Sequence, residues 1–160
     1  MSFFDDPALD NPFWQFSLDR YSRPSVATAC LDLQDRTGID VNLLLFAFWL
    51  GHERGRITKS LVALDAVVDW HETVVKPLRR ARIARRPPPG NPEDPVRQAI
   101  KELEVQTEQI EQAILFRMAR DLATEAGVNT HADMIQNAQR LMPVLAMEGD
   151  ALNRLAALCL

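Results

Sequence analysis

Hydrophobic residues along this chain recur every three to four positions, which is the spacing of one face of an α-helix. The β-branched residues do not alternate with polar ones, as they do in a half-buried β-strand. A chain of 160 residues is long enough to bury its own core. The pattern therefore predicts an all-α fold, in which residues 1–160 form a single-domain bundle of six to seven helices.

Prolines, glycines and capping residues set the expected boundaries of these helices. The first expected helix begins at Pro12, the second runs from Pro24 to Gly38, and the third runs from Val41 to about His52. The fourth runs from Thr58 to about Arg86, and the fifth from Pro95 to about Ala126. The sixth begins at Thr130 and ends or kinks near Pro143, and Asp150 caps a short seventh helix.

The expected N-termini depend on side chains that accept hydrogen bonds from free backbone amides. Asp10 or Asn11 is expected to cap the first helix, and Asp40 the third. Thr130, with Asp133 three residues later, resembles a capping box for the sixth helix.

The third expected helix is apolar on every side, because Leu43 to Leu50 contains eight apolar residues in a row. Such a helix is buried on all sides. The run is too short to span a membrane, which needs about 20 residues. We therefore expect it to form the core, wrapped by the first, second, fourth and fifth helices, and to end at Gly51 or Gly55.

A proline-rich connection separates the two longest expected helices. It covers residues 87–95 within RRPPPGNPEDP. Since helices joined by one connection pack side by side, we expect a long antiparallel hairpin. Pro77 removes a backbone donor in the first arm, so a kink is expected near Thr73. Residues 128–160 then form a C-terminal helical extension.

Composition and charge indicate which partners and which cellular compartment to expect. The net charge of −4 gives no general attraction to nucleic acids. Cys30 and Cys159 lie far apart in the chain, which favours neither a disulfide nor a zinc site. The N-terminal residues do not resemble a signal peptide. These features predict a cytoplasmic protein that is not inserted in a membrane.

One segment, KPLRRARIARR, concentrates positive charge without any acid. Its basic residues are Lys76, Arg79, Arg80, Arg82, Arg85 and Arg86. They could dock phosphate groups, RNA or an acidic partner. Alternatively, they stabilise a helix C-terminus and pair with acids of the other hairpin arm, which are Glu102, Glu104, Glu108 and Glu111.

The segment LDAVVDWHE is a second candidate site. Asp65, Asp69 and Glu72 share one helical face, and His71 falls on the apolar stripe. A Mg²⁺ site there would need a second acidic motif, for which DLQD (residues 32–35) is the candidate. No complete metal-ligating motif occurs, so a solvated acidic face is the alternative, and the sequence predicts neither a metal nor another cofactor.

The segment LQDRTGIDVN forms a polar corner before the apolar helix. Capping explains Asp40 and Gly38. It does not explain Gln34, Asp35 and Asn42 together. Because buried polar groups must be paired, we expect a hydrogen-bonded lock at this corner.

Two of these segments resemble motifs of a proteobacterial family of short conserved proteins of unknown function. The first motif is LQD-x-x-G-x-DVN-LLLF-x-x-WL, matched by residues 33–50, and the second is W-x-x-x-V-x-x-PLR-x-x-R, matched by residues 70–82. The resemblance covers roughly residues 10–115 and implies no reaction or substrate. It draws attention to Arg79 and Arg82, which lie one helical turn apart.

The sequence contains no complete set of catalytic residues, so the leading hypothesis is a non-enzymatic interaction or adaptor protein with another protein as its partner. The first alternative is a small-molecule or diphosphate-binding protein that uses Asp65, Asp69 and His71, with an arginine holding an anion. RNA binding through residues 76–86 is a further, weaker alternative. The candidate binding residues are Lys76, Arg79, Arg82, Asp35, Asn42, Asp69 and His71.

The C-terminal segment ALNRLAALCL has little polar cover. Exposed apolar surfaces of this kind usually mark contacts. A homodimer through this helix is therefore a possible arrangement.

Overall fold

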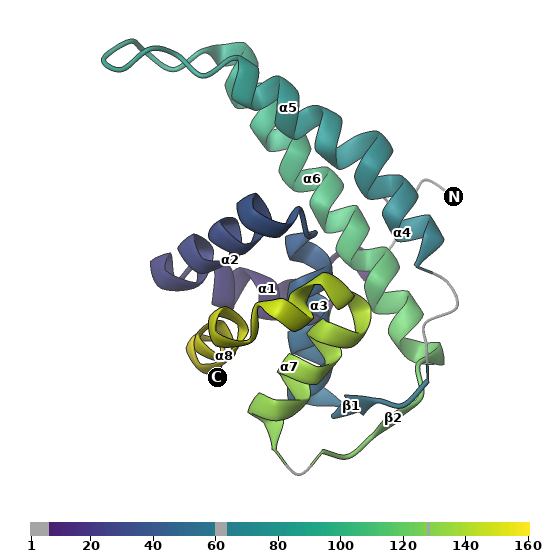
Figure 1. The fold of residues 1–160 in the computed structure, drawn as a ribbon. Helices are drawn as coiled ribbons and strands as arrows, with labels where there is room; N and C mark the ends of the chain where they lie inside the picture. The colour runs from purple at the N-terminus through teal and green to yellow at the C-terminus, as the bar shows by residue number, and fades with distance from the viewer. Residues whose placement is uncertain (1–6, 60–63, 128) are drawn as a thin grey trace.

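A computed structural model describes residues 7–59, 64–127 and 129–160. It confirms the all-α prediction: seven helices, counting α4 to α5 as one continuous helix, and a single pair of two-residue strands form the described part of the chain (Figure 1). A compact group of helices surrounds α3, and a long hairpin extends beyond it.

The first two helices begin where the sequence predicts, and the second also ends there. Helix α1 spans Pro12–Tyr21, and the side chain of Asn11 caps it by accepting a hydrogen bond from the backbone N–H of Trp14. Helix α2 spans Pro24–Thr37. It ends at Gly38, whose φ of +73° is a left-handed conformation that glycine adopts without strain.

Helix α3 (Val41–Glu53) forms the centre of the core, as expected, and Asp40 caps it by accepting from the backbone N–H of Asn42. Its closest partner is α7 (Thr130–Leu141), a helix that the expected arrangement left out of the core. Of the two glycines predicted to end α3, Gly55 follows the C-cap residue Arg54 with a φ of +85°, whereas Gly51 lies inside the helix. A Cβ on Gly51 would lie 2.6 Å from the backbone N of Met134. Gly51 therefore lets the two helices approach closely.

The fourth expected helix begins later than predicted. Residues Arg56–Ile57 form strand β1, so Thr58 is not helical, and α4 spans Asp65–Trp70. Residues 60–63, which the predicted helix includes, lie outside the described residues. The helix continues as a π-helix, η3 (His71–Val75), and then as α5 (Lys76–Ala84). The predicted distortion before Pro77 is thus a π-helical turn.

Helix α6 (Pro95–Met118) packs along this arm and completes the predicted hairpin. It is shorter than expected, because the 3₁₀-helix η4 (Ala119–Asp121) and strand β2 (Thr124–Glu125) follow it. Strand β2 pairs antiparallel with β1. The Pro-rich connection lies at the far tip of the hairpin, and the two strands lie near its opposite end (Figure 1).

The C-terminal segment folds back onto the core. The side chain of Asn129, rather than Thr130, caps α7, and the 3₁₀-helix η5 (Pro143–Met147) follows. Helix α8 spans Gly149–Leu158 and follows Glu148, so Asp150 lies inside it and is not its cap. The apolar face of α8 packs in the same chain against α2 and α7, and its buried residues are Leu152, Leu155, Ala156 and Cys159.

Within the described ranges, no helix combines the length and the apolar character that a membrane span requires.

Candidate functional site

A pocket of about 840 Å³ lies between α1, α2 and the start of α3 on one side and the α5–α6 hairpin on the other. Its walls are mainly apolar and aromatic. The residues that form them are Trp14, Leu18, Tyr21, Leu31, Val41, Leu45, Ile83 and Val105.

The face of α1 that carries Trp14, Leu18 and Tyr21 explains how the sequence builds this wall. The three residues are spaced four and three positions apart, so they share one helical face, and all three line the pocket. The core instead takes the neighbouring face of α1, with Phe13 and Phe16 buried. Helix α1 therefore uses one apolar face for the core and the other for the pocket.

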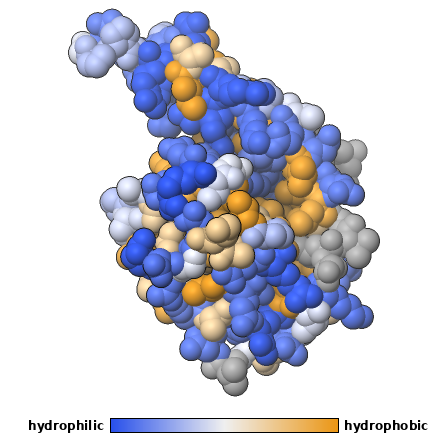
Figure 2. Space-filling model, viewed as in Figure 1, coloured by the Kyte–Doolittle hydropathy of each residue, from blue (hydrophilic) through white to orange (hydrophobic). Residues whose placement is uncertain are grey.

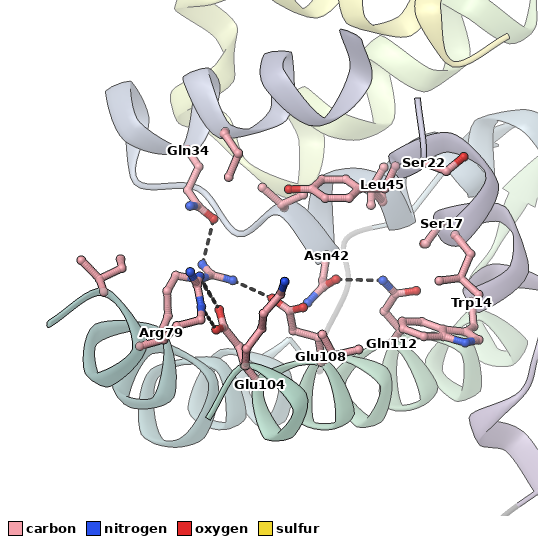
Figure 3. Close-up of a pocket in the computed structure, with 18 of the residues that line it drawn as sticks. Trp14, Ser17, Ser22, Gln34, Asn42, Leu45, Arg79, Glu104, Glu108 and Gln112 are labelled. Atoms are coloured by element: carbon pink, nitrogen blue, oxygen red, sulfur yellow. Dashed lines mark hydrogen bonds and ion pairs between the residues drawn. The ribbon is translucent and has the colours of Figure 1, made fainter. Parts of the chain in front are cut away.

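The long axis of the pocket follows α6. Lys101, Glu104, Glu108 and Gln112 line it from successive turns of this helix. Eleven residues of helix rise by roughly 16 Å, so the pocket is elongated. Figure 3 shows Arg79 and Glu104 toward one end, with Trp14 and Gln112 toward the other.

One end of the pocket is basic. Arg82, Arg86 and Lys101 line it there. Arg82 pairs with Glu104. Arg86 and Lys101 are exposed, and among the described residues neither has an acidic partner at ion-pair distance. Two cations at this end are therefore free to attract an anion.

The opposite end holds two buried polar atoms without partners. Ser17 Oγ and Gln112 Oε1 make no hydrogen bond to any described residue. Both residues line the pocket, and they are only 3% and 2% exposed. Buried polar atoms are nearly always hydrogen-bonded, so these two atoms indicate a missing partner at this end of the pocket.

Arg79 joins the two sides of the pocket (Figure 3). Its guanidinium donates to Gln34 Oε1 on α2 at 2.8 Å, and to Glu108 Oε1 at 2.7 Å and Glu104 Oε1 at 3.1 Å on α6. All three nitrogens of the group have a partner. Three of its five N–H groups are thus engaged, and Arg79 links α2 to α6 across the pocket.

The two acids that face Arg79 have opposite pKa shifts. Burial raises the pKa of Glu104, but hydrogen bonds from Arg82 and Arg79 outweigh burial and hold it below the ordinary value. Burial raises the pKa of Glu108, and the charge of Arg79 offsets this only in part. Glu104 is thus the ionised centre of the cluster.

A chain of hydrogen bonds runs from the pocket floor into the protein. Gln112 Nε2 donates to Asn42 Oδ1 at 2.8 Å, and Asn42 Nδ2 donates to Glu111 Oε2 at 2.7 Å. The other oxygen of Glu111 lies 3.0 Å from His71 Nδ1. The predicted lock is therefore present only in part: Asn42 is paired with α6 and Gln34 with Arg79, whereas Asp35 is exposed. The network ties α3 to both arms of the hairpin.

Asp40 completes a compact buried trio with His71 and Glu111. Its Oδ1 lies 3.5 Å from His71 Nδ1, and one ligand-type atom from each residue fits within 4.8 Å of the others. Burial, followed by the charge of Glu111, raises the pKa of Asp40, and burial also raises the pKa of Glu111. Burial lowers the pKa of His71. The trio therefore favours an added positive charge, and its donor atoms could hold a metal ion.

The comparisons with known proteins can be set against this geometry. Residues 12–115 match the family model described as Protein of unknown function (DUF2390). The chain belongs to the DUF2390 family. Searches of curated proteins and of solved structures found no match. All residues that line the pocket, and all three of the trio, lie inside the part that defines DUF2390.

Four of the candidate binding residues meet at the DUF2390 pocket: Arg79, Arg82, Asp35 and Asn42. Lys76 instead pairs with Glu72 on its own helix. Four of the six basic residues in the segment 76–86 have acidic partners among the described residues, and these are Lys76, Arg79, Arg82 and Arg85. The acids of the neighbouring arm thus neutralise part of this segment.

The grouping of Asp65, Asp69 and His71 does not occur. Asp65 and Asp69 are exposed, whereas His71 is buried and faces Glu111 and Asp40. The reason is that His71 follows the buried face of the helix. The prediction of a site that combines these three residues is therefore wrong. His71 instead belongs to the cluster with Asp40 and Glu111.

Sequence reasoning missed Glu111 and Gln112 as partners of Asn42. A signal was present, because Glu104, Glu108 and Glu111 are spaced four and three residues apart on one face of α6. That face was assigned only to pairing with the basic segment. It also supplies the polar groups that reach α3.

Proposed function

We propose that this protein binds a small amphipathic organic anion in the pocket between α1, α2 and the hairpin. The observation that carries the proposal is the pair of buried, unpartnered polar atoms on the pocket lining, Ser17 Oγ and Gln112 Oε1. Leaving such atoms without partners costs about 1–3 kcal/mol each. A ligand that donates hydrogen bonds at this end would recover that free energy.

The body of the ligand is expected to be apolar. Leu18, Leu31, Leu45 and Val105 come from four different helices and line the same pocket. Ligand pockets typically have such apolar walls with a few polar groups that fix orientation. The volume of about 840 Å³ lies within the usual range for small-molecule sites, roughly 300–1,000 Å³.

The anionic group of the ligand is expected at the basic end. Arg86 and Lys101 have no acidic partner among the described residues, so a carboxylate or phosphate there would meet two cations. Arg79 contributes differently, because its hydrogen bonds to Glu104, Glu108 and Gln34 hold it within the pocket wall. Arg79 therefore shapes the pocket wall, whereas Arg86 and Lys101 favour a ligand with a negative charge.

Two valines of α6 provide a matched test. Val105 and Val96 are 45% and 52% exposed, but only Val105 lines the pocket. Small molecules are extracted from each protein after it has been purified in its native state, and they are identified by mass spectrometry. We expect an amphipathic acid to accompany wild type and Val96→Trp but not Val105→Trp, in which the indole fills the pocket. Equal recovery from both variants, or no bound molecule in wild type, would contradict the proposal.

A protein-docking role on the hairpin is a second candidate. Figure 2 shows apolar surface on the projecting hairpin among polar residues. Its exposed apolar side chains include Ile83, Val96 and Leu103. Tagged protein purified from its own cells, with and without nuclease, should retain a stoichiometric protein partner that Leu103→Glu releases. Partner loss on nuclease treatment would instead indicate RNA.

A further inference from the structure

The trio of Asp40, His71 and Glu111 is not explained by the pocket. None of the three lines it, and they come from three separate elements: the cap of α3, the π-helix η3 and α6. The Glu111 side chain is fully buried and the His71 side chain is 6% exposed. Two carboxyl groups thus meet inside the protein, and no arginine or lysine contacts them among the described residues.

The spacing of the three donor atoms suits a metal ion. His71 Nδ1 lies 3.0 Å from Glu111 Oε1 and 3.5 Å from Asp40 Oδ1. Ligands at about 2.0–2.1 Å from a tetrahedral Zn²⁺ ion lie about 3.3 Å from one another. Small movements of these side chains would therefore place one ion at bonding distance from all three.

Neighbouring groups hold the carboxylates in position. The backbone N–H of Asn42 donates to Asp40 Oδ1, and its side chain donates to Glu111 Oε2. Gln112 in turn donates to Asn42. Hydrogen bonds of this kind orient metal ligands in many proteins and raise their affinity for the ion.

The local backbone also distinguishes His71. It is the first residue of the π-helical turn His71–Val75. Such turns are uncommon within α-helices and frequently occur at functional sites. Asp40 keeps 14% of its side chain exposed, which leaves one side of the trio open to solvent.

We infer that Asp40, His71 and Glu111 bind one divalent transition-metal ion, with Zn²⁺ as the best fit. One imidazole nitrogen and two carboxylate oxygens are accepted Zn²⁺ ligands. Mg²⁺ is a poorer match, since it favours six oxygen ligands. The fourth position would face the side on which Asp40 is exposed. This inference does not depend on the pocket ligand, because the pocket and the trio share no residue.

The test uses the full chain after removal of metals with a chelator. Zn²⁺ alone is titrated by calorimetry, and Co²⁺ alone is followed by its visible absorption, which is intense only for tetrahedral coordination. We expect one ion per chain, and affinity at least tenfold weaker in His71→Gln and in Glu111→Gln. His52→Gln is the control, because His52 pairs with Glu53 on the surface, away from the trio.

A measurement on the wild-type chain covers the case in which a variant does not fold. Zn²⁺ should shift the ¹⁵N resonance of His71 Nδ1 in nuclear magnetic resonance spectra, but not those of the other two histidines, His52 and His131. Three results would overturn the inference: no stoichiometric binding, equal affinity in the trio variants, or a shift confined to His52 or His131. The last would mean adventitious surface binding. Because Val105→Trp leaves the trio intact, its metal affinity should equal that of wild type.

Discussion

The side chain of Asn42 on α3 donates a hydrogen bond of 2.7 Å to Glu111 on α6, across 69 positions of sequence. This contact joins the central helix to the hairpin. Glu111 is fully buried, so the bond forms in a setting where an unpaired carboxyl group is costly. The polar corner before α3 is therefore hydrogen-bonded to α6. This helix contributes Glu104, Glu108 and Gln112 to the pocket wall and Glu111 to the buried trio.

Replacing Asn42 should lower stability. Asn42→Ala leaves Glu111 Oε2 and Gln112 Nε2 without their partners, so we expect the free energy of unfolding to fall by about 1–3 kcal/mol. Urea denaturation followed by circular dichroism measures the change. Asn91→Ala, in the exposed connection between α5 and α6, should change stability by less than about 0.5 kcal/mol. Equal effects of the two variants would count against the role of Asn42.

Glu104 should make stability depend on pH in the acid range. Its pKa in the folded protein is lowered from the ordinary value of 4.5, so its stabilising contribution is present above that value and is lost as the pH falls through the folded pKa. Glu104→Gln should cost about 2 kcal/mol at pH 7. The difference from wild type should shrink in more acidic buffer.

The control for this prediction is Glu93→Gln. Glu93 pairs with Arg97 on the surface, where ion pairs contribute at most about 1 kcal/mol. Denaturation curves of both variants across pH 2–7 provide the comparison. A Glu104→Gln deficit that stays constant down to the lowest pH would disprove the assignment of Glu104 as the ionised centre.

Gly51, the one glycine of α3, should not tolerate a side chain. A Cβ there would lie 2.6–2.9 Å from backbone atoms of Asp133 and Met134, so α7 would have to move. We expect Gly51→Ala to lower the free energy of unfolding by at least about 2 kcal/mol. Gly149→Ala meets no atom within 4 Å and should be neutral or slightly stabilising. Thermal unfolding of both variants tests this contrast.

The two cysteines should be unreactive in the native protein. Both are fully buried and free, and burial raises the pKa of Cys30 to about 12 and that of Cys159 to about 11. Since the thiolate is the reactive form, little of it exists at pH 8. Ellman's reagent should label neither thiol until denaturant is added. Rapid labelling of one thiol in native protein would show that α8 opens.

The helices could be predicted from the sequence because their signals are local. Pro12, Pro24, Asp40 and Gly38 act on their own backbone or on residues one turn away, and the predicted boundaries of α1, α2 and α3 are correct to within one residue. The burial of α3 on all sides followed from composition alone. Local rules failed where contacts between distant segments decide the structure. A helix was predicted to begin at Thr58, but the residues before it form strand β1, which pairs with β2.

The candidate site could be predicted only in part. Asn42 was found because helix capping does not explain it, and Arg79 because it matches the second family motif. Their partners Glu104 and Glu111 were visible as one helical face, but the sequence does not state which acid meets which group. Val96 and Leu103 are apolar residues at helical spacing, yet both are exposed, because the buried face of α6 there carries Glu104 and Thr107. Paired polar groups replaced the expected apolar ones.

The most direct test of ligand binding is a calorimetric titration with 10-hydroxydecyl phosphate, an amphipathic anion whose phosphate suits the basic end of the pocket and whose terminal hydroxyl can donate to Ser17 Oγ or Gln112 Oε1. Wild type and Val96→Trp should bind one molecule with equal affinity. Val105→Trp should bind at least tenfold more weakly, a loss of about 1.4 kcal/mol, and Lys101→Glu should also weaken binding. Arg80→Glu, a charge change outside the pocket, should not. No binding by wild type, or equal binding by Val105→Trp, would contradict the assignment of this pocket as the ligand site.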